Sequence, residues 1–178
     1  MTASKEVIGL SERQLVLKAK SGDKNAFCEL YGIYKDKLYR YAYYRLTNEN
    51  DAKDAVADCI VSSFEQISSL KKAEAFSSWI FRILYCSCNK YISNQVQNRQ
   101  SVNFGDIANT YHDNAKMETK TEVMQALEYL NYDEKNIVVL SVFGGMKSRE
   151  IAQIMNMKSG SVRSKLSRSL NKMRTFLE

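Results

Sequence analysis

Apolar residues recur at three- and four-residue steps through most of this chain, the spacing of one face of an α-helix. A capping-box pattern at Ser11 opens the first predicted helix. The turn Ser21-Gly22-Asp23 then supplies an N-cap for a second helix that is predicted to end near Leu46. Because Thr47-Asn48 interrupts the periodicity there, the pattern predicts helices joined by short polar turns.

The next predicted helix, residues 49–67, has two faces of opposite character. Carboxylates on one face without cationic partners repel one another, by about a few tenths of a kcal/mol per pair. Such a face suits a basic partner, although a merely solvated face has the same pattern. The acidic face consists of Asp51, Asp54, Asp58 and Glu65, and the opposite face, expected to be buried, of Val56, Ile60, Phe64 and Ile67.

A polar, basic loop over residues 68–74 precedes a helix predicted over residues 76–92. That helix is apolar nearly all round, so most of it is expected to lie in the core. Its polar edge, with Arg82 and Asn89 seven residues apart, is therefore left for contacts with a partner.

Residues 94–121 are rich in Asn, Gln, Ser, Thr and Gly, a composition that predicts a mobile linker. Helical periodicity returns at Thr121, and a helix for which Asp133 is a candidate cap is predicted to end at Gly144-Gly145. The predicted fold class is all-α, with two small helical domains joined by a flexible linker. The predicted ranges are 8–93 for the first domain, 94–121 for the linker and 122–178 for the second domain.

The last segment has the most specific pattern. A short helix over residues 148–155 meets the turn Asn156-Met157-Lys158, and a second helix starts near Ser159, which is the spacing of a helix-turn-helix. Asn156 occupies a turn position where a left-handed backbone is common. The second helix is expected to bury Val162, Leu166, Leu170 and Met173. It is expected to present donors for base edges and phosphates at Ser161, Arg163, Ser164, Lys165, Ser167, Arg168 and Lys172.

Composition and charge narrow the possible classes of protein. The chain has no proline and seven glycines, too few turn residues for a β-rich fold. The net charge of +6 lies entirely in residues 141–178, which carry eight Lys and Arg against two Asp and Glu. Such a segment suits a polyanion such as DNA, although on charge alone a solvated helix face explains it equally well. Farther upstream, residues 49–65 carry a net charge of −4 and residues 71–99 one of +4, which indicates two surfaces for two kinds of partner.

Other classes of protein lack support in the sequence. No run of 18 apolar residues occurs, so no membrane insertion is expected, and without a signal-peptide pattern the predicted location is cytoplasmic. The single histidine, His112, has no plausible catalytic partner nearby. Metal-ligand spacing is missing among Cys28, Cys59, Cys86 and Cys88, so the thiols are predicted to be small core residues. We therefore expect no active site, no metal and no cofactor.

The segments DAKDAVADCIVSSF, FSSWIFRI, LEYLNYDEKNIVVL and GGMKSREIAQIMNMKSGSVRSKLSRSLNKMR, in this order, resemble the sigma-70 family of bacterial RNA polymerase sigma factors. More narrowly, the chain resembles the extracytoplasmic-function (ECF) group, which has only sigma regions 2 and 4. The resemblance covers roughly residues 11–95 and 122–177 and implies a factor that directs core polymerase to promoters. The implied partners are core RNA polymerase, through its β′ clamp helices and β flap, and promoter DNA. An anti-sigma factor is a further partner that the group allows.

The resemblance also implies three binding surfaces. The helix that includes Asp51, Asp54, Asp58, Ile60 and Phe64 would bind the β′ clamp helices. The stretch that includes Lys71, Lys72, Trp79, Arg82, Asn89 and Lys90 would melt and read the minus-ten promoter element. The final helix would read the minus-thirty-five element through Ser159, Ser161, Arg163, Ser164, Lys165, Arg168 and Lys172.

The chain departs from the family pattern at a few positions. Asn131 stands where a proline is common, which predicts a looser turn. Cys86, Lys90 and Ser93 replace the usual residues of the promoter-reading helix, and these changes leave the minus-ten preference open. Two alternatives to a sigma factor remain at this point. One is a stand-alone helix-turn-helix regulator, and the other is an enzyme or membrane-surface protein that uses the cysteines or the basic helix.

Overall fold

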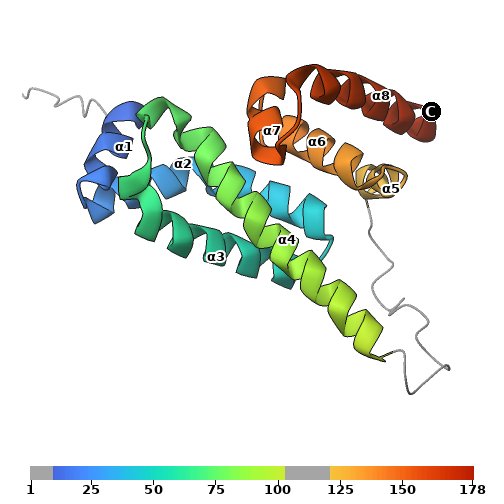
Figure 1. Cartoon of the computed structure of the whole chain (residues 1–178), viewed down its shortest axis with the longest axis horizontal. Helices are drawn as coiled ribbons and strands as arrows, with labels where there is room; N and C mark the ends of the chain where they lie inside the picture. The colour runs from blue at the N-terminus through green and yellow to red at the C-terminus, as the bar shows by residue number, and fades with distance from the viewer. Residues whose placement is uncertain (1–9, 103–120) are drawn as a thin grey trace, which may run out of the picture.

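The computed structural model describes residues 10–102 and 121–178, and within these ranges every regular element is helical (Figure 1). The predicted all-α class is therefore confirmed. The first group of helices is α1 (Glu12–Lys20), α2 (Lys24–Leu46), α3 (Glu49–Gln66) and α4 (Phe76–Val102), with the short 3-10 helices η1 (Ile67–Ser69) and η2 (Ala73–Ala75) between α3 and α4. The second group is α5 (Glu122–Glu128), α6 (Tyr132–Val142), α7 (Ser148–Met155) and α8 (Ser159–Leu177).

Local sequence signals set the ends of the first helices, as predicted. The Ser11 side chain accepts from the backbone of Gln14 in a complete capping box, and the Asp23 carboxylate caps α2. Thr47 has a φ of 57°, in the left-handed region, which ends α2 and lets the Asn48 side chain cap α3. These caps satisfy backbone groups that would otherwise be unpaired at the helix ends.

Helices α2, α3 and α4 pack on one another through aromatic rings and small residues. The ring of Tyr34 meets that of Phe76 edge to face with centroids 5.4 Å apart, and Tyr41 meets Phe81 in the same way at 5.9 Å. Helix α1 closes one end, where the Tyr34 hydroxyl donates to Glu12 at 2.7 Å. This packing holds α3 and α4 side by side, each with one face exposed (Figure 1).

Two predictions about the middle of the chain need correction. Residues 94–102 lie in the last turns of α4, although the linker was predicted to begin at residue 94, because the polar residues there continue the helix. Residues 103–120, which make up the rest of the predicted linker and include His112, lie outside the described residues. Asn131 was predicted to loosen its turn, but it caps α6 in a capping box with Glu134, so Asp133 is not the cap.

Helices α7 and α8 form the predicted helix-turn-helix. Asn156 has a φ of 54°, in the left-handed region, and Ile151, Ala152 and Val162 are buried between the two helices. Leu170 was predicted to be buried, but 42% of its surface is exposed, and Ser169 is buried in its place. The side of α8 that packs on its own domain passes through Val162, Leu166 and Ser169. An α-helix has 3.6 residues per turn, so a strict four-residue step from Leu166 leads to Leu170, which is rotated away from that side.

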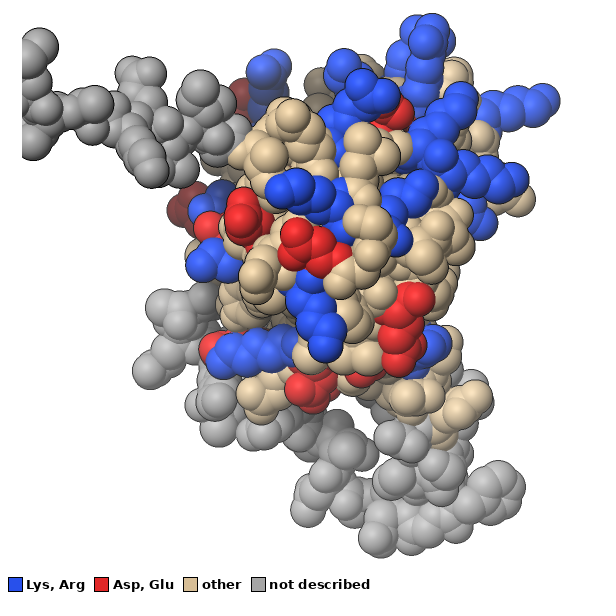
Figure 2. Space-filling view, turned by 90° about the vertical axis from the view of Figure 1, so that its left-hand side faces the viewer, with Lys and Arg blue, Asp and Glu red and all other residues tan. Residues whose placement is uncertain are grey.

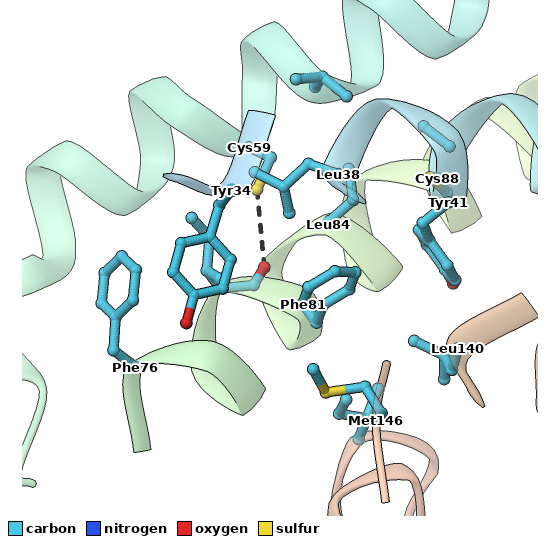
Figure 3. Close-up of a cluster of buried hydrophobic side chains, with 14 of the residues drawn as sticks. Tyr34, Leu38, Tyr41, Cys59, Phe76, Phe81, Leu84, Cys88, Leu140 and Met146 are labelled. Atoms are coloured by element: carbon cyan, nitrogen blue, oxygen red, sulfur yellow. Dashed lines mark hydrogen bonds between the residues drawn. The ribbon is translucent and has the colours of Figure 1, made fainter. Parts of the chain in front are cut away.

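One continuous cluster of buried apolar side chains joins the two groups of helices. Leu140 of α6 and Met146 of the α6–α7 turn lie close to Phe81 of α4 and Tyr41 of α2 (Figure 3).

Two of the four cysteines are buried and two are exposed. Cys59 and Cys88 are buried as predicted, whereas Cys28 and Cys86 are exposed, so the prediction of a core role is wrong for the latter two.

Candidate polymerase and nucleic-acid interfaces

The acidic face of α3 lies along the C-terminal half of α4. Asp51 accepts a hydrogen bond from Gln95 Nε2 at 2.6 Å, and Asp58 accepts one from the Tyr91 hydroxyl at 3.2 Å. Partial burial and the bond to Asp58 raise the pKa of Tyr91 to about 12, so this phenol stays a neutral donor. Within the described residues these carboxylates have neutral donors rather than ion-pair partners, and the face keeps its negative charge.

An exposed apolar groove lies between α2 and α3. Its apolar lining includes Tyr31, Tyr39, Val56, Ile60 and Val61. Phe64, on the apolar side of α3, is 44% exposed, and its ring meets that of Phe27 edge to face with centroids 5.2 Å apart. The residues that α3 does bury are small, namely Ala52, Ala55, Val56, Cys59 and Ser63, because α2 and α4 approach it closely.

The basic loop and the start of α4 come together at one hollow. It has a volume of about 320 Å³ and is lined by Lys71, Lys72, Trp79 and Arg82, with Gln153 and Ile154 of α7 on the opposite side. Trp79 is half-buried, and its ring is tilted against that of Phe76 with centroids 5.9 Å apart. An aromatic ring among three cations has the chemistry to stack on a base and neutralise phosphates.

The remaining two residues predicted for the minus-ten surface lie farther along α4. Lys90 is exposed. Asn89 is half-buried, and its Oδ1 accepts from the Tyr132 hydroxyl of α6 at 2.8 Å and from Arg45 Nη2 of α2 at 3.4 Å. The structure therefore places Asn89 at the contact between the two groups of helices rather than at the hollow with Trp79.

The outer face of α8 presents a second basic surface. Arg163, Ser164, Ser167 and Arg168 line a shallow hollow together with Gly160. Figure 2 shows Lys and Arg side chains gathered over the upper part of a view that looks toward the N-terminal end of α8. Ser159 is half-buried and Ser161 is exposed at the start of the helix. These cations and hydroxyls stand on one exposed helix, as required for insertion into a major groove.

Two lysines predicted for this surface turn back toward α6. Lys165 Nζ lies 2.7 Å from Asp133 Oδ2, and Lys172 Nζ lies 2.7 Å from Glu134 Oε1. The hydrogen bond from Lys172 lowers the pKa of Glu134 below its ordinary value. Sequence analysis missed both acidic partners, since nothing local in the sequence indicates that α6 faces α8.

The structure offers little support for metal or membrane chemistry. No cluster of three or more His, Cys, Asp or Glu side chains able to hold a metal ion occurs in residues 10–102 and 121–178. In the same ranges no helix has the length and hydropathy needed to cross a bilayer.

Comparisons with known proteins agree with the division of the chain into two groups of helices. Residues 30–96 match the family model of sigma-70 region 2, and residues 120–173 match that of sigma-70 region 4. RNA polymerase sigma factor SigV of Bacillus subtilis is 27% identical, over 90% of this chain and 96% of the relative. The ECF RNA polymerase sigma-E factor of Haemophilus influenzae is 25% identical, over 90% of this chain and 92% of the relative.

Solved structures show that the fold is shared. CnrH in complex with the cytosolic domain of CnrY matches with a TM-score of 0.71 and 20% identity, over 93% of this chain and 96% of that one. The sigma factor RpoE, in complex with the anti-sigma factor NepR from Bartonella quintana, matches with a TM-score of 0.71 and 19% identity. That match covers 85% of this chain and 96% of the other.

The chain belongs to the sigma-70 family, because region 2 and region 4 occur in it in the family's order. Its relatives over about nine-tenths of the chain are ECF factors. It is an ECF RNA polymerase sigma factor that initiates transcription, a specificity subunit without catalysis of its own. A stand-alone helix-turn-helix regulator is thereby ruled out, since such a protein would not need region 2.

Proposed function

We propose that the factor binds its partners through three separate surfaces, one for core polymerase and two for promoter DNA. The observation that carries this proposal is the separation of exposed charge. Asp51, Asp54 and Asp58, which have no ion-pair partner among the described residues, gather on one face of α3, while cations gather at the Trp79 hollow and on α8. A protein partner with a basic face and two stretches of nucleic acid fit this arrangement.

The proposed polymerase surface is α3, with its acidic face on one side and the apolar groove between α2 and α3 on the other. Asp51, Asp54 and Asp58 would steer the β′ clamp helices by charge, and Ile60 and Phe64 would supply apolar area. The exposed Phe64 ring supports this role, because a large apolar side chain beside a charged rim is typical of a protein interface. Region 4 would contact the β flap in the same holoenzyme.

The minus-ten surface begins at the hollow around Trp79. Lys71, Lys72 and Arg82 would neutralise phosphates of the melted strand while Trp79 stacks on a base. Asn89 and Lys90 lie about two helical turns beyond Arg82 and would extend the surface along α4. Asn89 would become available only after its bond to Tyr132 breaks.

The minus-thirty-five surface is the outer face of α8. Arg163 and Ser164 lie near the N-terminal end of the helix, with Ser159 and Ser161, where such helices meet base edges. Arg168 lies farther along and would contact phosphate. Lys165 and Lys172 are both ion-paired with carboxylates of α6 in the structure. They would therefore attract DNA through their charge at a distance, or contact it after leaving those carboxylates.

We also propose a regulatory protein partner of the anti-sigma type. The sigma factor RpoE, which shares this fold, has been solved in complex with the anti-sigma factor NepR. The acidic face and groove that suit polymerase would be the surface for which such a protein competes. Because its polymerase and promoter are found in the bacterial cytoplasm, we place the factor there.

In vitro transcription tests the division of surfaces. The purified factor and core polymerase are incubated with a library of genomic fragments, and transcript start sites are mapped. We expect start sites with common elements near minus ten and minus thirty-five. Reversing Asp54 should reduce transcription from every site alike, while Arg163→Ala should change which minus-thirty-five elements are used. Identical site selection by the wild type and Arg163→Ala would contradict the assignment of α8.

A further inference from the structure

Two carboxylates in the first turn of α6 hold two lysines of α8. Helix α8 lies along α6 (Figure 1), and the contact between them includes both pairs. Asp133 pairs with Lys165 and Glu134 pairs with Lys172, with the closest nitrogen and oxygen atoms 2.7 Å apart in each case. We call these four residues the α6–α8 ion pairs.

The two lysines lie beside the side of α8 that is proposed to face DNA. An α-helix turns by about 100° per residue, so Lys165, Arg168 and Lys172 point within about 60° of one another around the helix. Arg168 itself lines the exposed hollow on the outer face, together with Arg163. The lysines therefore stand at the edge between that face and α6. From this edge a long and flexible lysine side chain has either a carboxylate or a DNA phosphate within its reach.

The carboxylates are held in position and are partly shielded from salt. Glu134 Oε2 also accepts from the backbone N–H of Asn131 at 3.2 Å, in the capping box of α6, and its side chain is only 11% exposed. In the other pair the side chain of Lys165 is 29% exposed. Salt screens partly buried charges less than exposed ones, such as those of Glu49 and Lys53. The α6–α8 ion pairs should therefore persist at physiological ionic strength.

These pairs bear directly on the affinity of α8 for DNA. A lysine that contacts a phosphate releases a condensed counterion, which contributes affinity that depends on salt and not on sequence. A paired lysine must first leave its carboxylate, and that carboxylate then stands unpaired near a phosphate of the same sign. Attraction at a distance is also weakened, because the negative charge beside each lysine offsets its positive charge.

We propose that the two carboxylates of α6 keep Lys165 and Lys172 away from DNA phosphates and thereby limit the affinity of α8 for DNA of any sequence. The proposal rests on the minus-thirty-five surface proposed above and adds two residues that set its sequence-independent affinity. Base contacts made by Arg163 are unaffected, so the factor would be held less on DNA that lacks a promoter.

Binding of a short, fluorescein-labelled duplex of mixed sequence to the full-length factor tests this proposal. Asp133→Asn with Glu134→Gln removes both charges but keeps the size of each side chain, and Gln also suits a capping box. We expect the plot of log affinity against log salt concentration to steepen by about two units, because each freed lysine adds about 0.9. The gain in affinity should thus be about tenfold larger at about 50 mM salt than at about 200 mM. An unchanged slope or weaker binding, with wild-type helicity by circular dichroism, would overturn the proposal.

A matched control makes the same change of net charge and leaves the α6–α8 ion pairs intact. Glu122→Gln with Glu178→Gln also removes two carboxylates of region 4, both exposed, at the start of α5 and just after α8. Its slope should stay at the wild-type value, because no lysine is freed. Equal steepening in the control and in the test variant would overturn the proposal, since net charge would then explain the gain.

Two further variants identify the source of the gain. Adding Lys165→Gln and Lys172→Gln to the carboxylate double variant should remove the gain, and a gain that survives would overturn the proposal. Asp133→Asn alone leaves the capping box of Asn131 and Glu134 in place and should steepen the slope by about one unit. This single variant tests the proposal even if the double variant is too unstable, and an unchanged slope in it would overturn the proposal.

Failure of the minus-thirty-five assignment would give a different result. Arg163→Ala with Arg168→Ala should weaken binding of the same duplex if the outer face of α8 contacts DNA. Unchanged binding in that variant would count against the DNA surface itself, and the role of the carboxylates would fall with it. Weakened binding there, combined with an unchanged slope in the carboxylate variants, would overturn the role of Asp133 and Glu134 alone.

Discussion

Lys172 of α8 donates to both carboxylate oxygens of Glu134 on α6, with its Nζ 2.7 Å from Oε1 and 2.9 Å from Oε2. Seven residues earlier on α8, Lys165 makes a similar contact with Asp133. Two basic residues of the helix that we propose to face DNA thus hold that helix on α6. These two ion pairs link α8, which carries Arg163 and Arg168, to α6.

The Glu134 contact predicts a pH dependence of stability. The folded protein has a lowered Glu134 pKa, while an unfolded Glu titrates near about 4.3. The contact therefore stabilises the fold above that pH, and the stabilisation is lost as the pH falls through the folded pKa. Glu134→Gln should reduce the free energy of unfolding by about 0.5–1 kcal/mol at neutral pH, the scale of an ion pair at the protein surface, because Lys172 is half-exposed although Glu134 is largely buried. Urea unfolding from pH 7 down to pH 3 measures the difference, which should shrink in acid.

A matched change separates this effect from loss of any surface ion pair. Glu49→Gln removes the pair between Glu49 and Lys53, both of which are largely exposed. Its loss of stability should be smaller than that of Glu134→Gln. A difference between wild type and Glu134→Gln that stays constant down to the lowest pH would contradict the linkage.

The basic residues of α8 should differ in what they contribute to promoter binding. Arg163→Ala should relax preference at particular minus-thirty-five positions, because an Arg that reads guanine contributes about 1–3 kcal/mol of discrimination. Arg168→Ala should weaken all sequences alike and lower the salt slope by roughly one unit. Binding of holoenzyme to promoter libraries at several salt concentrations measures both effects. Equal, sequence-independent losses from the two variants would show that the helix supplies charge without reading bases.

The acidic face of α3 is expected to bind core polymerase. Asp54→Lys with Asp58→Lys should weaken assembly, because reversed charge repels a basic partner. Both side chains are exposed, so helicity should be unchanged. Titration of labelled factor with core polymerase measures the affinity. Glu29→Lys is a control for a single reversal, since Glu29 is exposed on α2 outside the acidic face. Wild-type affinity in the double variant would mean that another surface binds polymerase.

The cap at Asn131 gives a prediction about stability. Its Oδ1 accepts from Glu134 N at 3.0 Å, and its own N–H donates to Glu134 Oε2 at 3.2 Å. Asn131→Ala should therefore lower the free energy of unfolding by about 1 kcal/mol, as for other N-caps. Thermal unfolding of the full chain measures the loss. No loss would mean that the turn is as loose as the sequence alone suggested.

Features governed by neighbouring residues were predictable, and contacts between distant ones were not. Ser11 and Asp23 were identified as caps because a cap bonds to a backbone group only a few residues away. The partner of Asn89 is 43 residues away, and those of Lys165 and Lys172 are 32 and 38 residues away. Helical periodicity gives the face of a residue but not the helix that it meets, so these three side chains were assigned to DNA.

Phe64 and Leu170 illustrate a second limit. Each lies on the apolar side of its helix, yet 44% of the Phe64 surface and 42% of the Leu170 surface are exposed. A hydrophobic pattern indicates that a face is buried against something, without indicating whether this chain supplies the partner. For Phe64 the missing cover is consistent with the proposed polymerase surface.

The four thiols divide into two reactivity classes. Burial raises the pKa of Cys59 and of Cys88 to about 12, so neither forms a thiolate near neutral pH, while Cys28 and Cys86 stand in solvent. Alkylation with iodoacetamide should therefore stop at two adducts per folded chain and reach four in denaturant. The rate at which the third and fourth adducts form would follow the opening of the α2–α3–α4 packing. Counting adducts per chain by mass spectrometry at successive times would thus measure how fast this region opens, without any engineered residue.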